Sequence, residues 1–521
     1  MHRTRWSRGP EGLASARADV FSHIFNVGRI NFRNLKPGAK PCQPLTIAAF
    51  LYLDAPLPVE VIRPAFMERV VSKIMRLRAV TRMRRGWTHF DEVAPEDLDL
   101  DYHFFTITET LDTEEQWEAL VSSWSKMPMD GDKPMWRIGT AQRLPCGRPA
   151  IVMLVDHTVA DGLSLVEMAC KMLCDGFRAP QRTSTTTSTV ADEHMPSRPG
   201  LFGRMLRSIR GVNKALFEPF SFSDRPNSLK MKGNVPEGYT FATCPIPLCL
   251  NKIKEIKRMV PGTTVNDVML SLSALSVAQF FKERDEPLYR KKKDIQTTFI
   301  VETRPRDAAK TDDKWFGNDF VATSMVYPLH DDPIKTLLRC HRSTTAIKTT
   351  ADIPIRAFVR DRVLPLVPNR SITDIAADIN CKFTGNTSNV FVSDSKLFIA
   401  GVGIDDVRFA TFTPFGLYIG ISTYNGKVSY NIVLAKDLGV NPHDLARHIA
   451  PQLDDLYTKV WESANPGIPV QFPPSTAAVA ATTASQSAKD QPAKVEAAAA
   501  DSKLPEEQPA AADVTHVLAQ A

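Results

Sequence analysis

The chain has 521 residues, 43% of them hydrophobic, so it can bury a substantial core and form two or three domains. Basic side chains number 64 against 58 acidic ones, and this small excess argues against a nucleic-acid-binding protein. The eight cysteines form no CxxC pair, which favours free thiols and gives no zinc-ligand spacing. These values exclude a disordered chain and a small disulfide-stapled scaffold.

Residues 1–35 are interpreted as an N-terminal extension, and residues 36–180 as an N-terminal lobe. Residues 45–53 are rich in apolar and aromatic side chains and predict a buried strand. Eight Lys or Arg between residues 63 and 85 fit either a surface for a polyanion or phospholipid, or a solvated helix face. Steps of four and three residues predict one helix with a single core-facing stripe, formed by Ile62, Phe66, Val70, Ile74 and Leu77.

Residues 150–155 include no polar side chain, which is typical of a strand covered on both faces. The chain leaves this strand at Asp156 and passes through the segment 157–162. Ser164 and Glu167 then form an S-x-x-E pattern, which predicts a capping box for the following helix.

His157 is our candidate general base. A buried strand holds such a histidine at a fixed height, and neutral imidazole, with a pKa near ~6.5, can accept a hydroxyl proton. Asp161 would keep the loop aligned by pairing with an arginine elsewhere, and Gly162 would supply backbone freedom for the turn. A hydrogen-bonded histidine in an ordinary loop is the alternative interpretation.

Residues 181–235 are interpreted as an inter-lobe linker. Residues 180–200 are rich in Thr, Ser and Pro and cannot bury enough surface to fold. A helix follows, which fits either a membrane-surface helix or a crossover helix packed across two lobes. Its predicted apolar face comprises Met205, Leu206, Ile209, Val212 and Leu216, and its basic face comprises Arg204, Arg207, Arg210 and Lys214.

Residues 236–465 are interpreted as a C-terminal lobe. Thr264 and Asp267 predict a capped helix start, which gives Asp267 a structural role at the helix dipole. Asn266 has no such role, so its amide is a candidate for positioning substrate or stabilising an oxyanion, a contribution of ~3–4 kcal/mol. Asn425 and Gly426 separate two alternating runs and predict a hairpin.

Residues 466–521 are dominated by Ala, Ser, Thr, Pro and Gln and are predicted to be a disordered tail. The longest apolar stretch, 268–281, falls short of the ~20 residues that cross a bilayer, so we expect no transmembrane helix. The chain has no Walker loop, GxGxxG or G-x-S-x-G. These absences argue against kinases, nucleotide-cofactor oxidoreductases and serine hydrolases.

Several motifs resemble those of one family. The H-x-x-x-D-G pattern at 157–162 resembles the signature of the CoA-dependent acyltransferase superfamily. Residues 128–136 are similar to the P-L-D-x-x-x-P-L-W stretch of the wax ester synthase/diacylglycerol acyltransferase family, and 264–268 to its N-D motif. Gly317-Asn318 and residues 388–390 resemble two later landmarks. The order of the motifs covers roughly residues 40–460, with Asp156 in place of a first histidine and Phe391-Val392 in place of Pro-Gly.

This resemblance implies a two-lobed α/β fold with mixed sheets, like chloramphenicol acetyltransferase, with an active-site channel between the lobes. By analogy with related acyltransferases, Arg304 would pair with Asp161, with Arg306 as the competitor.

The implied reaction esterifies a fatty alcohol or diacylglycerol, with acyl-CoA as co-substrate and no permanent cofactor or metal. The expected location is intracellular, cytoplasmic or peripheral on a membrane or lipid-droplet surface such as the endoplasmic reticulum. The alternatives are another acceptor, such as an amine or a polyketide-like hydroxyl, and a catalytically silent lipid-binding homologue.

Overall fold

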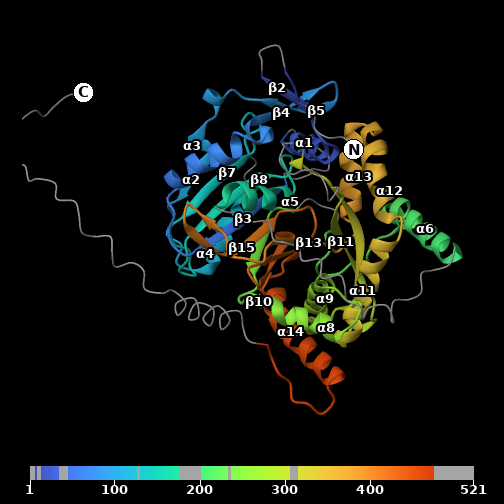
Figure 1. Cartoon of the computed structure of the whole chain (residues 1–521). Helices are drawn as coiled ribbons and strands as arrows, with labels where there is room; N and C mark the ends of the chain where they lie inside the picture. Colours follow the sequence, from blue (N-terminus) through green and yellow to red (C-terminus); the bar gives the residue numbers. More distant parts are fainter. Residues whose placement is uncertain are drawn as a thin grey trace, which may run out of the picture. The chain divides into compact units, whose positions relative to one another are not determined.

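The structure is a computed structural model (Figure 1). It describes residues 6–8, 13–33, 45–125, 129–175, 201–232, 236–304 and 315–473. Pro128, Arg306, the Thr/Ser-rich part of the predicted linker and the predicted tail from residue 474 lie outside the described residues.

A six-stranded sheet carries the strand that leads to His157. Its strand order is β14-β15-β3-β8-β7-β6, with β3 and β8 antiparallel at the centre. Every residue of β8 is buried, so the predicted double-sided strand is confirmed. The strands are β3 Thr46–Leu53, β6 Phe104–Ile107, β7 Trp136–Ala141, β8 Ala150–Asp156, β14 Phe398–Ile399 and β15 Val402–Thr411.

Two strands of this sheet come from the second half of the chain. β15 pairs antiparallel with β3, from Ile404 opposite Leu53 to Thr411 opposite Ile47. Without β15, one edge of β3 would leave its backbone N–H and C=O groups unpaired. The N-terminal lobe is therefore not the continuous segment 36–180 that the sequence predicted, because part of 236–465 completes its sheet.

The second large sheet has the order β10-β17-β16-β13-β11-β12, and β9 also pairs with β17. The predicted hairpin is confirmed: Asn425 and Gly426, with φ of 46° and 75°, join β16 to β17. Both positive φ values are those that a two-residue type I′ turn requires. The strands are β9 Tyr239–Thr243, β10 Leu248–Cys249, β11 Ile295–Glu302, β12 Phe320–Tyr327, β13 Gly385–Ser393, β16 Leu417–Tyr424 and β17 Lys427–Ala435.

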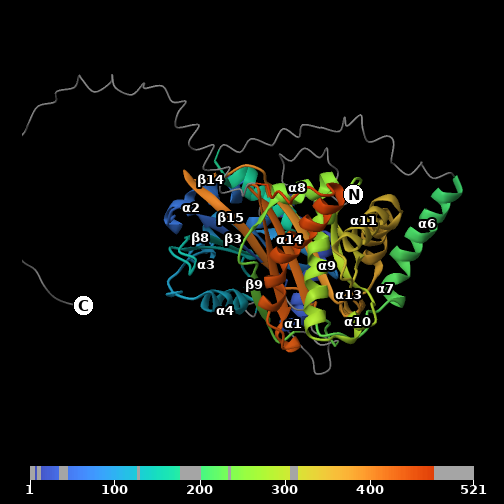
Figure 2. The same ribbon diagram turned by 90° about the horizontal axis from the view of Figure 1, so that it is seen from below.

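Helices cover the second sheet and form one apolar core with it. α9 and α14 lie side by side in this core (Figure 2). α9 begins at the Thr264 cap, as predicted. The helices of this half are α8 Leu250–Met259, α9 Val265–Glu283, α10 Pro287–Arg290, α11 Pro333–Thr349, α12 Asp352–Phe358, α13 Asn369–Asn380 and α14 His443–Ala464.

The described part of the predicted N-terminal extension belongs to the fold. A third sheet has the order β1-β2-β5-β4, and α1, Val20–Arg33, contacts both β5 and α13. The described residues of this segment are therefore built into the fold rather than appended to it. The strands of this sheet are β1 Trp6–Arg8, β2 Ala14–Arg17, β4 Ala79–Arg84 and β5 Trp87–Glu92.

The predicted stripe after β3 is buried, but the single helix that should carry it is wrong. α2 spans Val59–Phe66 and continues as a π-helical turn, Met67–Val71. Ile74 is extended, with φ −108° and ψ 103°, and a 3₁₀ turn, Met75–Arg78, follows. The other helices of this half are α3 Leu100–His103, α4 Glu114–Trp124 and α5 Gly162–Met168.

The basic side chains between residues 63 and 85 are largely paired with carboxylates within the molecule. Six of its arginines form ion pairs with carboxylates of other segments. The pairs are Arg63 with Asp101, Arg69 with Asp175, Arg76 with Asp19, Arg78 with Glu92, Arg82 with Asp132, and Arg84 with Asp91.

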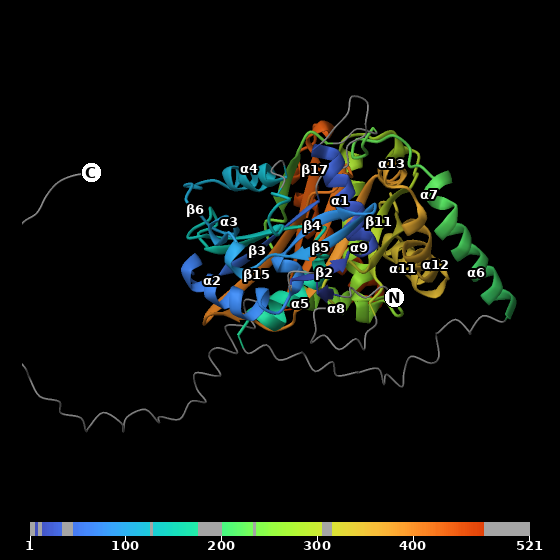
Figure 3. The same ribbon diagram turned by 90° about the horizontal axis from the view of Figure 1, so that it is seen from above.

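The predicted amphipathic helix is α6, Leu201–Leu216, followed by α7, Glu218–Ser221. α6 contacts α12 at the outer edge of the structure (Figure 3). Gly211 allows this contact, since a Cβ there would lie 2.6 Å from the Ala351 nitrogen. The described apolar residues Ile209, Val212 and Leu216 stay exposed. For these three residues, the predicted packing across the lobes is therefore wrong.

Within the described ranges, no helix combines the length and the apolar character that a bilayer span requires.

Candidate active site

His157 follows directly on β8, and its backbone N–H donates to the Leu45 carbonyl at 2.7 Å. Asp161 is the N-cap of α5, because its Oδ1 accepts the Ser164 backbone N–H at 2.9 Å. The predicted capping box of Ser164 and Glu167 is wrong, since the helix begins three residues earlier. The Ser164 hydroxyl instead donates to the Gly317 carbonyl at 2.9 Å.

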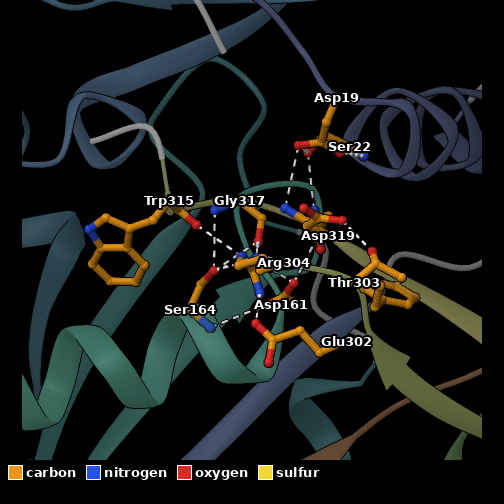
Figure 4. A network of polar contacts seen from close by, with 12 residues as sticks. Asp19, Ser22, Asp161, Ser164, Glu302, Thr303, Arg304, Trp315, Gly317 and Asp319 are labelled. Carbon is orange, nitrogen blue, oxygen red and sulfur yellow. Dashed lines mark hydrogen bonds and ion pairs between the residues drawn. The ribbon is translucent and has the colours of Figure 1, made fainter. Parts of the chain in front are cut away.

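Asp161 forms a buried ion pair with Arg304 (Figure 4). Arg304 Nη2 lies 2.7 Å from Asp161 Oδ2, and the two side chains are 11% and 8% exposed. The same nitrogen donates to the Gly317 carbonyl, and the backbone N–H of Asp319 donates to Asp161. The pair thus ties α5 to the segment that ends at Arg304 and to the segment around Gly317 and Asp319. Arg306, the predicted competitor, lies outside the described residues.

The charge of Asp161 is stabilised by these partners. Burial alone would raise the pKa of its carboxyl group, but Arg304 and the donated hydrogen bonds outweigh burial and lower it. Asp161 is therefore ionised at neutral pH and places a fixed negative charge near His157.

The His157 ring contacts two aromatic side chains, with centroid separations of 4.9 Å from Phe25 and 5.8 Å from Phe320. Its Nδ1 lies 3.0 Å from Asn318 Oδ1. Burial lowers the pKa of His157, although Asp161, a hydrogen bond to the backbone of His157 itself and the Asn318 hydrogen bond act in the opposite direction. The imidazole is therefore mainly neutral at neutral pH, the form that can accept a proton.

His157, Asp161 and Gly162, the three site residues predicted from this segment, all line one cavity of about 430 Å³. Its wall is largely apolar and is built from α1, both large sheets, α5 and α13. Such a volume suits a sizeable organic ligand. Representative apolar wall residues are Phe21, Ile47, Leu165, Phe320, Ile372 and Ile379.

Gly162 contributes to this site differently from the prediction. Its φ is not in the left-handed region, so the turn does not require the backbone freedom of glycine. Gly162 is the first residue of α5 and lines the cavity. A Cβ there would have ordinary contact with Val390, at 3.9 Å, so glycine here mainly leaves cavity space open.

The structure does not bring Asn266 to the cavity. Its Oδ1 accepts a hydrogen bond from Asn389 of β13 at 2.8 Å, and it is not a wall residue. The predicted structural role of Asp267 is confirmed, because Asp267 and Thr264 form the capping box of α9. Asp267 also accepts from His341 Nδ1 at 2.9 Å when that nitrogen is protonated.

Asp156, which replaces the first histidine of the motif, does not line the cavity. It is 1% exposed, and its Oδ1 accepts the Thr158 backbone N–H at 2.8 Å. Successive residues at a strand end point to opposite faces. The substitution therefore shapes the turn after β8 and leaves the cavity wall unchanged.

The second departure from the motifs, Phe391 and Val392, belongs to strand β13 rather than to a loop. The pairing of β13 with β16 shifts register between Phe391 and Ser393. Such a bulge bends a strand locally, and Val392 lies in the cavity wall.

Sequence reasoning missed the inner support of His157. Arg76 forms an ion pair with Asp19 at 2.8 Å, and Ser22 of α1 donates to the same carboxylate at 2.7 Å. Asn318 then donates to Ser22 at 3.0 Å. The Gly317-Asn318 landmark is the sequence signal for this support, because neither residues 1–35 nor Arg76 carries a local pattern that predicts contact with His157.

Two cysteines, Cys170 and Cys174, also line the cavity. Burial raises the pKa of Cys170 to about 12 and raises that of Cys174 as well. Both thiols are therefore protonated at neutral pH and poor nucleophiles. The residues that the structure describes contain no group of three or more His, Cys, Asp or Glu side chains placed to hold a metal ion.

The sequence matches two models of one family. The wax ester synthase/diacylglycerol acyltransferase catalytic domain matches residues 40–269, and the C-terminal domain of the same family matches residues 316–457. A putative diacylglycerol O-acyltransferase of Mycobacterium tuberculosis is 25% identical over 304 residues, which is 53% of this chain and 61% of that protein. The chain thus spans about three-fifths of this relative's length.

Solved structures share the fold. The wax ester synthase/diacylglycerol acyltransferase of Marinobacter aquaeolei has a TM-score of 0.53 at 19% identity and covers 83% of this chain and 97% of its own. Trichothecene 15-O-acetyltransferase of Fusarium sporotrichioides has a TM-score of 0.56 at 11% identity, with coverage of 87% and 97%. The fold is the two-lobed fold of CoA-dependent acyltransferases, as the motifs predicted, and the chain belongs to the wax ester synthase/diacylglycerol acyltransferase family.

Proposed function

We propose that this chain is an acyl-CoA-dependent O-acyltransferase that esterifies a long-chain alcohol or diacylglycerol, with His157 as general base. The observation that carries the proposal is a partly buried His157, whose pKa is lowered by burial, in the wall of a large apolar cavity. The ion pair of Asp161 with Arg304 holds the adjoining helix start in place. Family membership supports the reaction class.

In the proposed reaction, the imidazole of His157 takes the proton of the acceptor hydroxyl. The acceptor oxygen attacks the thioester carbonyl, so a C–O bond forms and the carbonyl oxygen becomes an oxyanion. When this intermediate collapses, the C–S bond breaks and the imidazolium returns its proton to the leaving thiolate. The products are an ester and free CoA, and the enzyme regains its neutral histidine.

Asp161 assists this cycle by position and charge. Its carboxylate favours the transient imidazolium electrostatically. Arg304 keeps the carboxylate ionised and fixed at the start of α5. We assign Asp161 and Arg304 a positioning role, since His157 is the group that meets the reacting hydroxyl.

The apolar cavity wall supports long-chain substrates. Burying apolar surface gains roughly 25 cal/mol per Å², so each additional methylene of a chain strengthens binding by about 0.8 kcal/mol. The affinity for a substrate should therefore rise with the length of its hydrocarbon chain until the cavity is filled.

The proposal is tested by measuring thiol release from palmitoyl-CoA with hexadecanol, with diacylglycerol, with a long-chain amine, and without an acceptor. We expect acceptor-dependent release and an ester product with one of the two hydroxyl acceptors. Release only with the amine would indicate a different acceptor class. Binding of palmitoyl-CoA without transfer to any acceptor would indicate a silent lipid-binding homologue and contradict the proposal.

We also propose that the outer face of α6 and α7 rests on a lipid surface. The apolar residues of this face are exposed, including Ile209 at 54% and Phe220 at 65%, and Phe220 also lines the cavity. Arg210 is exposed on the same helix and would attract anionic head groups. In this arrangement an apolar acceptor passes from the lipid surface along Phe220 into the cavity.

Sedimentation with phosphatidylcholine vesicles, with and without phosphatidylglycerol, tests this surface. The double variant Val212→Ser/Leu216→Ser should lose vesicle binding. Ile246→Ser is the matched control, because Ile246 is equally apolar and 67% exposed but lies outside α6 and α7. Equal binding of the double variant and the wild type would exclude α6 as the docking face.

A further inference from the structure

We propose that Asn318 is a positioning residue that locks neutral His157 in the tautomer with its proton on Nδ1, leaving Nε2 as the proton acceptor. Its catalytic consequence rests on the proposed function of His157. The tautomer itself is a property of the ligand-free protein and can be measured separately.

The orientation of the Asn318 carboxamide follows from one contact. Its Nδ2 lies 2.7 Å from the backbone carbonyl oxygen of His157. A carbonyl oxygen can only accept a hydrogen bond, so the carboxamide atom facing it must be the nitrogen. The opposite carboxamide atom, 3.0 Å from His157 Nδ1, is therefore the oxygen.

The tautomer of His157 follows in turn. A carboxamide oxygen cannot donate, so His157 Nδ1 must carry the proton of the hydrogen bond to Asn318. A neutral imidazole has only one N–H, which leaves the lone pair on Nε2. Among the described residues, no hydrogen bond to Nε2 is formed, so this lone pair remains available in the cavity wall.

A buried network holds the carboxamide in this orientation. Asn318 Nδ2 also donates to Ser22 Oγ at 3.0 Å, and Ser22 Oγ donates to Asp19 at 2.7 Å. Arg76, which is 1% exposed, pairs with Asp19 and donates to Ser22. Flipping the carboxamide would place its oxygen against both the His157 carbonyl and a hydroxyl already committed as donor. The segment of Asp19 and Ser22, the segment of Arg76 and the segment of Asn318 thus together fix the proton on Nδ1 of His157.

The tautomer can be read directly by ¹⁵N NMR of protein labelled at histidine. Two-bond correlations distinguish a protonated ring nitrogen from an unprotonated one, and His157→Ala identifies the His157 signals. We expect a protonated Nδ1 and an unprotonated Nε2 in the wild type. In Asn318→Ala the His157 pattern should move towards a mixture of tautomers.

Asn369→Ala provides a matched control. Asn369 Oδ1 lies 2.9 Å from Nε2 of another buried histidine, His23, so this variant removes the same kind of contact elsewhere. The His157 signals should not change in it. A wild-type His157 protonated on Nε2 would overturn the proposal.

Kinetics test the consequence. Asn318→Ala should lower kcat for CoA release roughly 10-fold or more, towards the ~100-fold that a general base typically contributes, with KM nearly unchanged. Asn318→Asp keeps an acceptor for the Nδ1 proton but places its second oxygen against the His157 carbonyl oxygen, so kcat should stay below the wild-type value. Its carboxylate should also move the acid limb of the pH profile to higher pH, because a negative charge favours imidazolium.

The outcomes separate the two proposals. A fully active His157→Ala would end the general-base proposal and leave the tautomer measurement standing. An inactive His157→Ala combined with an Asn318→Ala of unchanged tautomer and kcat would end only the inference about Asn318.

Discussion

The starts of α5 and α9 are built alike. At each, an aspartate stabilises the helix N-terminus: Asp161 accepts the Ser164 N–H, and Asp267 forms a capping box with Thr264. Each aspartate also has a basic partner from a distant segment, Arg304 for Asp161 and His341 for Asp267. From sequence, both segments were candidates for chemistry.

Their surroundings differ. His157 and Gly162, at the start of α5, meet the large apolar cavity. Asn266, at the start of α9, contacts Asn389 of β13 and does not reach the cavity. A capping pattern therefore fixes where a helix begins, whereas the position of that helix against the sheets decides whether its polar neighbours meet a substrate.

Replacing one histidine at each helix start should give the largest difference in activity. His157→Ala should lower the rate of CoA release by ~100-fold or more, because the proton acceptor is lost. His341→Ala removes the basic partner of Asp267. The rate of CoA release should stay within about 3-fold of the wild-type value, far less than the loss of a general base.

Thiol-release assays on both variants, with circular dichroism as the check on folding, provide the measurement. Retention of more than about 10% of the wild-type rate by His157→Ala would be incompatible with a general base.

Arg304→Met tests the support at α5. It leaves Asp161 buried without its partner, so we expect the free energy of unfolding to fall by about 3–5 kcal/mol, with a lower kcat. Urea denaturation measures the first effect and thiol release the second.

The double variant Asp161→Asn/Arg304→Met serves as the control for Arg304→Met. It should recover part of the lost stability, because no uncompensated charge remains in it. If the single variant were as stable as the wild type, the ion pair would not anchor this region.

Asn266→Ala should have the smallest effect. Loss of its hydrogen bond with Asn389 should cost about 0.5–1.5 kcal/mol of stability and change kcat by less than about 3-fold. A loss of ~100-fold or more in kcat, the size expected for an oxyanion donor, would restore the predicted catalytic role of Asn266.

Several features of this molecule that depend on a local sequence pattern were predicted correctly. The apolar run of β8, the type I′ turn at Asn425 and Gly426, and the α9 cap were all predictable, because each depends on residues a few positions apart. The motif at 157–162 and its resemblance to a family made His157 a candidate for the general base.

The remaining features depend on contacts between distant segments. β15 pairs with β3 although more than half of the chain separates them in sequence. No local sequence pattern predicts this pairing. Arg76 looked like a surface cation, yet it is buried against Asp19. The start of α5 was misplaced because Asp161 and Ser164 both have capping side chains, and only tertiary contacts decide which of them caps.

The most direct test of the central claim, that neutral His157 accepts the proton, is the pH dependence of kcat/KM for CoA release. Burial lowers the pKa of His157 below 6.5, so its basic form increases as pH rises through that lower value and dominates at neutral pH. The account predicts a rising limb with a midpoint below pH 6.5 and a plateau through neutral pH. A midpoint above pH 6.5, or a rate that falls as pH rises towards neutrality, would contradict it.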